Sequence, residues 1–218
     1  MTVLASTAPS GPVRQTTVTF RVLLGAGGLA ALAFFAIAVL PYANYRAEAF
    51  GPIPELYWPR RHALLVHIAG GTVALLLGPV TLWLGETRRR LGLHRPLGFA
   101  YIGGVAVGTG AAVYLSLTTP VGWIFASGLF GLAVAWTITT GMAFMAIARR
   151  AITQHREWMI RSYVKTLAFV FFRAFAGGLE SLGVGTPVER ASAAAWFCWA
   201  VPLLLTEPVL QWRKQARG

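Results

Sequence analysis

The chain has 218 residues, of which 56% are hydrophobic and only 12% carry a charge. Because soluble globular domains average about 25% charged residues, this composition indicates an integral membrane protein. The net charge of +12 does not indicate nucleic-acid binding, since the basic residues lie in short loops between apolar runs. There is no Asp and one cysteine, Cys198, which excludes an Asp-based catalytic pair or triad and any intrachain disulfide. Cys198 is expected to be a small buried hydrophobe.

Residues 1–19 are polar and contain Pro and Gly, so they are expected to form a disordered cytoplasmic tail. The following membrane domain, residues 20–212, contains six apolar runs, each long enough for a helix to cross roughly 30 Å of hydrocarbon. The predicted spans are residues 22–40, 63–84, 96–117, 121–148, 158–178 and 191–211. Residues 213–218 form a basic tail. A cleaved signal peptide is the alternative for the first run, but no small-residue cleavage site follows at the expected place.

The basic residues of the loops predict the orientation of the spans. With the N-terminus inside, the cytoplasmic segments hold 13 Lys and Arg residues and the outer segments hold four. Such an excess is typical of cytoplasmic loops. The sequence therefore predicts an all-α bundle of six transmembrane helices, with both termini cytoplasmic, in the lipid bilayer of a bacterial inner membrane.

The histidines are the best candidate cofactor ligands. His67 lies about one turn into the second span, and small residues follow it on one helical face: Gly71, Ala74, Gly78, Thr81 and Gly85. Such a groove suits a flat cofactor between helices, and it equally suits close packing of two membrane helices. His67 is therefore either a ligand or proton-handling group, or a hydrogen-bonded packing residue.

His94 and His155 occupy matching positions at the cytoplasmic starts of the third and fifth spans, and an Arg follows each. Two histidines at one depth on neighbouring helices can bind one haem iron, while Arg95 and Arg156 pair with the haem propionates. The alternative is that both His-Arg pairs are interfacial anchors near anionic headgroups.

The predicted depths limit the number of haems. His67 is expected near the outer side, so it cannot share one haem with His94 and His155. A second haem would need a partner for His67 at the outer end of the fourth span, where residues 121–125 contain no ligand. His62, five residues earlier, points about 140° away from His67.

The fifth span carries charges that a bilayer should reject. On a continuous helix, an arc of roughly 120° contains His155, Trp158, Arg161, Ser162, Lys165, Arg173 and Glu180. The basic stripe (Arg161, Lys165 and Arg173) invites an anionic partner, such as haem propionates, a quinone headgroup or an acidic lipid. If instead Glu207 pairs with Lys165 and Glu180 pairs with Arg173, the stripe is structural. The fourth-span threonines Thr137, Thr139 and Thr140 are expected to bond their own helix or a neighbour.

Three stretches resemble the bacterial membrane protein family called domain of unknown function 2306 (DUF2306). They are His67 with the Gly-Gly run ending at Gly78-Pro79, the stretch from His94 to Gly98, and the stretch from His155 to Tyr163. The resemblance covers roughly residues 60 to 180 and implies a membrane architecture, without a function to carry over. The layout is also similar to membrane cytochromes of the b-561 type, with six helices and histidine ligands on the central four, but the fourth span lacks a histidine.

The leading hypothesis is a b-type haem or quinone-linked electron-transfer protein. In it, His94 and His155 are axial ligands, His67 is an outer ligand or proton group, and the basic stripe binds propionates or a quinone. The alternative is a small-molecule or ion transporter, or a non-enzymatic membrane subunit, in which the same charges line a polar pathway or bind lipid. Transporters often contain broken helices, and Pro79 and Pro202 are the expected breaks. A redox partner or a homo-oligomer is compatible with either hypothesis.

Overall fold

A computed structural model describes residues 13–46, 57–88 and 90–215 of the chain, and every regular element in these residues is a helix. The α-helices are α1 (Val13–Phe34), α3 (Arg61–Thr87), α4 (Leu91–Thr118), α5 (Trp123–Ala148), α6 (Ile152–Thr166), α7 (Ala168–Ser181) and α8 (Pro187–Gln215). A π-turn (Phe35–Val39) and a 3-10 turn (Leu40–Asn44) extend α1, and another 3-10 turn (Trp58–Arg60) precedes α3. The all-α prediction is therefore confirmed for the described residues.

Five helical segments, not the expected six, are long and apolar enough to cross a membrane among the described residues. They are Leu24–Asn44, Trp58–Thr87, Leu91–Thr118, Trp123–Ala148 and Pro187–Trp212. The expected fifth span, residues 158–178, is instead divided between α6, with 15 residues, and α7, with 14. The prediction of one continuous helix there was wrong.

The division falls at Leu167, where ψ is 0° and the helix direction changes. No Pro or Gly lies at this point. Thr166, the last residue of α6, directs its hydroxyl to the Ser162 carbonyl at 3.2 Å, and such a bond to the preceding turn bends helices. The expected breaks behave differently, because Pro79 lies inside α3 and Pro202 inside α8 without ending either helix.

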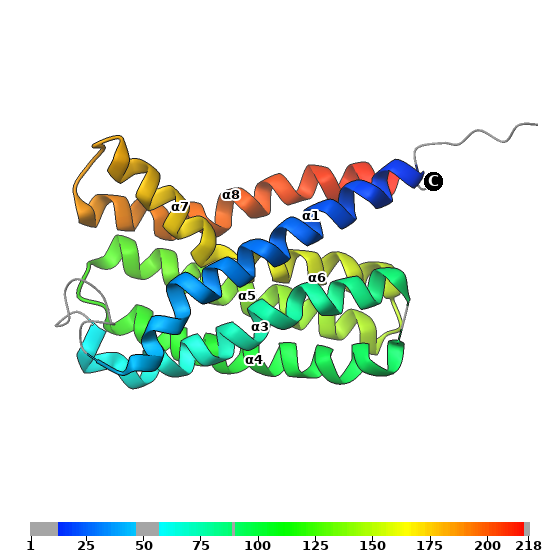
Figure 1. Cartoon of the computed structure of the whole chain (residues 1–218), viewed down its shortest axis with the longest axis horizontal. Coiled ribbons are helices and arrows are strands. Elements are labelled where there is room, and N and C mark those ends of the chain that lie inside the picture. The colour runs from blue at the N-terminus through cyan, green and yellow to red at the C-terminus, as the bar shows by residue number, and fades with distance from the viewer. Residues whose placement is uncertain (1–12, 47–56, 89, 216–218) are drawn as a thin grey trace, which may run out of the picture.

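The helices run back and forth along one long axis (Figure 1). α3, α4, α5 and α6 form a four-helix bundle. α1 crosses this bundle obliquely, and α7 packs on α8 above it. The start of α1 and the end of α8 lie at the same end of the bundle, which is also where the α3–α4 and α5–α6 turns lie. α6 and α7 together run from this end to the opposite one.

The bundle is held most closely where α3 meets α4. A Cβ on Gly70 would lie 2.5 Å from the Gly104 carbonyl oxygen and 2.5 Å from the Gly108 nitrogen, so the two backbones touch. Small residues permit this approach in membrane helices. Beside this contact, a buried core of Ala74, Tyr101, Val105, Trp136, Ala143, Met159 and Tyr163 joins α3, α4, α5 and α6. Cys198 belongs to a second buried cluster and is 1% exposed, as predicted.

Only part of each predicted tail lies within the described residues. α1 already begins at Val13, inside the segment expected to be a disordered tail, and residues 1–12 lie outside the described residues. α8 continues to Gln215, and residues 216–218 also lie outside them.

Candidate functional site

His94 and His155 come together at the end of the bundle where α4 and α6 begin. Their ring centroids are 6.4 Å apart and their planes are nearly perpendicular, at 88°. Both side chains are half-buried. The His94 ring lies against α3 at Gly85, where an added Cβ would be 3.2 Å from the imidazole carbon Cε1. The absence of a side chain at Gly85 therefore makes room for the pair.

Each imidazole is oriented by a hydrogen bond to a backbone carbonyl of a neighbouring helix. Nδ1 of His94 lies 3.1 Å from the Thr81 oxygen, and Nδ1 of His155 lies 2.8 Å from the Ala143 oxygen. Because a carbonyl only accepts, Nδ1 carries the proton in both rings and Nε2 keeps its lone pair. Histidines that bind metals are oriented in this way.

His155 lies in the first turn of α6, ahead of the apolar residues 158–178. Burial lowers the pKa of its imidazole; the bond to the Ala143 carbonyl raises the pKa, and the neighbouring His94 lowers it. The net direction is downward, so the structure favours the neutral ring, which is the form that binds a metal.

A chain of hydroxyl groups lies two helical turns deeper, between α4, α5 and α6. Tyr101 and Ser162 are 0% exposed, and Trp136 and Thr140 are 5% and 4% exposed. The tyrosine oxygen lies 2.8 Å from the Ser162 hydroxyl and 2.9 Å from that of Thr166. Ser162 Oγ lies 2.7 Å from Thr140 Oγ1, which donates to the Trp136 carbonyl at 2.8 Å. The Trp136 indole donates to Thr166 at 3.1 Å.

These contacts form a loop that satisfies every member. Each hydroxyl can donate one proton and accept at least one. The Ser162 carbonyl also lies 3.2 Å from the Thr166 hydroxyl, so Thr166 gives its one proton either to that carbonyl or to Tyr101. With either choice the buried hydroxyl loop links α4, α5 and α6.

The hydroxyl loop lies on the same helical faces as the histidine pair. Tyr101 follows His94 by seven residues and Ser162 follows His155 by seven, so each lies on the same helical face as its histidine, about 10 Å further along. The expectation that Thr140 would bond its own helix or a neighbour is confirmed, since it does both. Sequence reasoning missed the loop as a whole, and the seven-residue spacing on both helices was the available signal.

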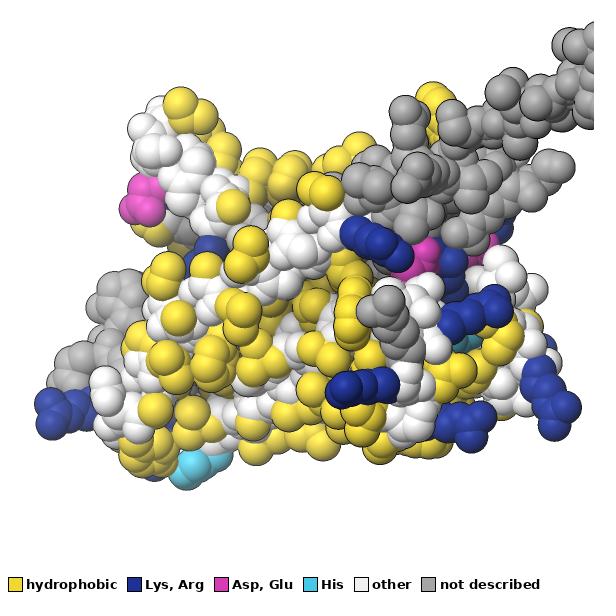
Figure 2. Space-filling model, turned by 45° about the vertical axis from the view of Figure 1, so that its right-hand side comes forward, with side chains coloured by type: hydrophobic (Ala, Val, Ile, Leu, Met, Phe, Trp, Pro, Cys, Tyr) yellow, Lys and Arg dark blue, Asp and Glu magenta, His cyan; other side chains and the backbone are white. Residues whose placement is uncertain are grey.

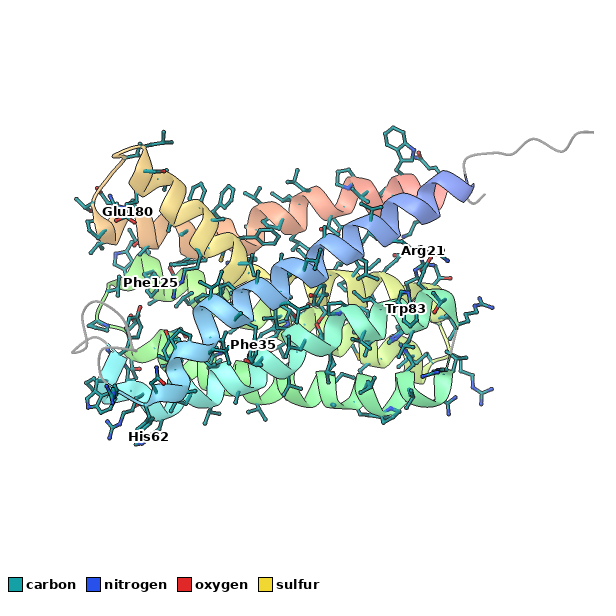
Figure 3. The ribbon with its side chains drawn as sticks, viewed as in Figure 1. Arg21, Phe35, His62, Trp83, Phe125 and Glu180 are labelled. Atoms are coloured by element: carbon teal, nitrogen blue, oxygen red, sulfur yellow. The ribbon has the colours of Figure 1, made fainter. Side chains whose placement is uncertain are left out.

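His67 lies apart from this pair, as its predicted depth required. Its Nδ1 is 2.8 Å from the Gly108 carbonyl oxygen of α4, and its ring meets the edge of Phe169 on α7 at 6.0 Å. The small-residue groove below it holds side chains of the protein: the Tyr163 ring occupies the space beside Gly78, and the His94 ring that beside Gly85. Side chains of neighbouring helices therefore fill two positions of this groove, while a Cβ at Gly71 would meet nothing within 4 Å. His62, with Nε2 3.1 Å from the Tyr45 hydroxyl, lies at the end of α3 opposite to Trp83 (Figure 3).

The basic stripe is not continuous, because the bend at Leu167 separates Arg161 and Lys165 from Arg173. Arg161 binds Glu207 of α8 through two nitrogens, at 2.6 and 2.7 Å. The two pairings expected for a structural stripe do not form: Glu207 pairs with Arg161 and not Lys165, and Glu180 lies 3.8 Å from Arg190 and not beside Arg173. A periodic pattern locates charges on one helix but does not reveal their partners on another.

Lys165 and Arg173 differ in their surroundings. Lys165 is 2% exposed and its Nζ donates to the Arg161 carbonyl at 3.2 Å. Arg173 is exposed on α7 and lies near Tyr57, just outside the span of α3. Burial raises the pKa of the Tyr57 phenol, while the Arg173 guanidinium acts in the opposite direction. Neither cation forms an ion pair with a carboxylate in the described part of the chain.

Basic side chains gather at the end of the bundle that holds the histidine pair (Figure 2). Arg95 is exposed there, directly after His94, and Arg156 forms an ion pair with Glu86 of α3. The side of the bundle is covered by hydrophobic side chains, as lipid contact requires. Among the described residues there is no group of three or more His, Cys or carboxylate side chains able to hold a metal ion.

Comparisons with known proteins identify a family. No curated protein and no solved structure matches the chain. A family model described as predicted membrane protein (DUF2306) matches residues 64–210, which include His67, both histidines of the pair and the basic stripe. The match covers more than half of the chain, so this protein belongs to the DUF2306 family of predicted membrane proteins.

Proposed function

We propose that this membrane protein binds one b-type haem between His94 and His155 and transfers electrons, exchanging them with a membrane-soluble partner such as a quinone. The observation that carries the proposal is the histidine pair itself. The two ring centroids lie 6.4 Å apart, and because Nδ1 of each ring bonds to a backbone carbonyl, the two Nε2 atoms are the ones that would hold the iron.

The number of ligands favours haem over a bare metal ion. A structural zinc site takes four protein ligands, whereas the pair has no third His, Cys or carboxylate ligand among the described residues. A haem would need no more than two protein ligands, which is the number that the pair supplies, and it would supply the one-electron chemistry. Arg95 and the neighbouring exposed arginines Arg149 and Arg150 would face the propionates.

We place the histidine pair at the cytoplasmic side of the membrane, with both termini cytoplasmic and α6 and α7 together completing a sixth crossing. The excess of basic residues at this end supports this orientation. His67 is proposed as an outer proton-handling or ligand residue without a second histidine, so one haem is expected, not two.

The test is an absorbance spectrum of detergent-purified protein, oxidised and reduced with dithionite. A Soret band with sharp reduced α and β bands is expected for wild type and for His62→Ala, and both His94→Ala and His155→Ala should lose it. A colourless wild-type protein after expression with ample haem would contradict the proposal.

A second candidate function is ion or small-molecule transport, which the bend at Leu167 favours, since discontinuous helices form the sites of many transporters. This candidate expects a colourless protein. Anion flux from liposomes that contain the protein, measured with an anion-selective electrode and lost in Lys165→Met, would support it.

A further inference from the structure

Among the charged residues that the structure describes, Lys165 alone is buried, with 2% of its surface exposed. An ammonium group has three donors, and the Arg161 carbonyl at 3.2 Å accepts one. No carboxylate of the described residues forms an ion pair with it. A buried cation without a counter-ion is costly in a protein and more so in a membrane.

The Glu207 carboxylate is near enough to act on Lys165 electrostatically, but it is bound by Arg161. A row of alternating charges leads inward from the basic end between α6 and α8. Lys214 lies 3.0 Å from Glu157, Glu157 lies 3.8 Å from Arg161, and Arg161 holds Glu207 at 2.6 Å. Lys165 is the last member of this row. Three cations and two carboxylates leave a single uncompensated positive charge at its inner end.

The position of Lys165 restricts what can supply that charge. It lies 13 residues after the start of α6, which is about 20 Å along the helix axis from the basic end. The Lys165 side chain turns back toward the Arg161 carbonyl, beside the Arg161–Glu207 ion pair. The Glu207 side chain is 39% exposed, so a ligand can approach this part of the row on the α8 side.

We propose that Lys165 binds a membrane-soluble ligand that carries one anionic oxygen on an apolar body, and that this ligand enters between α6 and α8 beside Glu207. The carboxylate of a fatty acid and the oxyanion of a deprotonated quinol share this chemistry. The site lies ten residues beyond His155 on α6, and its occupation does not depend on haem.

The experiment measures the thermal unfolding of detergent-purified protein with sodium laurate, with methyl laurate and with a short-chain benzoquinol. At a hundredfold excess over the Kd, laurate should raise the Tm of wild type by roughly 5–10 °C. Methyl laurate, which has the same chain without the anionic oxygen, should not. Lys165→Met should lose the laurate shift while its Tm without ligand equals or exceeds that of wild type. Lys214→Met, the matched control at the outer end of the row, should keep the shift.

A second variant keeps the test independent of whether Lys165→Met folds. Glu207→Gln raises the excess charge from one to two while leaving an oxygen for Arg161, so it should bind laurate more tightly than wild type. A shift with the benzoquinol alone assigns the ligand to the quinol source, and a shift with laurate alone assigns it to fatty acids. Equal shifts in wild type and Lys165→Met, equal shifts with laurate and methyl laurate, or no shift with either anionic probe would overturn the inference. His94→Ala should keep the shift, so failure of the haem proposal is separable.

Discussion

The α3–α4 pair and the α6–α7 crossing hold to the bundle by opposite means. α3 and α4 touch backbone to backbone at Gly70, without a charged side chain at the contact. α6 and α7 instead form two short helices, joined at Leu167 and held by the hydroxyl loop and the Arg161–Glu207 ion pair. Close packing of small residues therefore builds the frame, while polar bonds position α6, which carries His155. Substitutions on the two sides should therefore fail for different reasons.

The largest effect is expected at the glycine contact. Gly70→Ala places a Cβ 2.5 Å from backbone atoms of α4, and backbone cannot move aside as a side chain can. We expect a loss of about 3 kcal/mol in the free energy of unfolding, at the upper end of the usual cost of overpacking. Thermal unfolding followed by tryptophan fluorescence measures it. Gly71→Ala, with nothing within 4 Å, is the control; equal losses in the two variants would contradict the contact.

The ion pair of α6 should come next. Arg161→Met leaves the Glu207 carboxylate without its two-nitrogen partner, which for a fully buried pair costs about 3–5 kcal/mol. Because the Glu207 side chain is 39% exposed, we expect about 2 kcal/mol. The double variant Arg161→Met, Glu207→Met should recover most of this loss in the same unfolding assay. A double variant as unstable as the single one would show that the pair is not the cause.

The hydroxyl loop offers a smaller change. Tyr101→Phe removes one hydroxyl and leaves both Ser162 and Thr166 with an unmet contact, so we expect a loss of about 1–2 kcal/mol. The same substitution at Tyr114, which is 51% exposed, should change little. If the two variants behave alike in thermal unfolding, the loop does not stabilise the crossing. Haem binding, read from the absorbance spectrum, should weaken in the first variant only.

The smallest effect is expected at the outer end of the charge row. Lys214 lies 3.0 Å from Glu157, but its side chain is 49% exposed, and exposed ion pairs contribute about 0.2–1 kcal/mol. Lys214→Met should lower the free energy of unfolding by about 0.5 kcal/mol or less, and 1 M salt should remove the difference. A loss as large as that of Arg161→Met would show that the row acts as one unit.

Several features of the candidate site could be predicted from sequence because they depend on one helix at a time. The placement of His94 and His155 at matching helix starts was predicted, and the structure brings the two rings together. The burial of Cys198 within an apolar run was also predicted and confirmed. The pairings considered as an alternative, Glu207 with Lys165 and Glu180 with Arg173, do not form, since helical periodicity gives the direction of a side chain but not the rotation of the helix opposite.

Length, hydropathy and loop charge act locally, so the amino-acid sequence alone predicts a helical membrane protein, the positions of its apolar runs and the basic end of the bundle. The bend at Leu167, a point without Pro or Gly, is seen only in the folded bundle. The Thr166 hydroxyl takes part in a loop with residues of two other helices, and those contacts exist only in the assembled bundle. For the same reason, only the fold shows that Lys165 forms no ion pair with a carboxylate of the described residues, since its burial and the binding of Glu207 by Arg161 depend on how α6 meets α8.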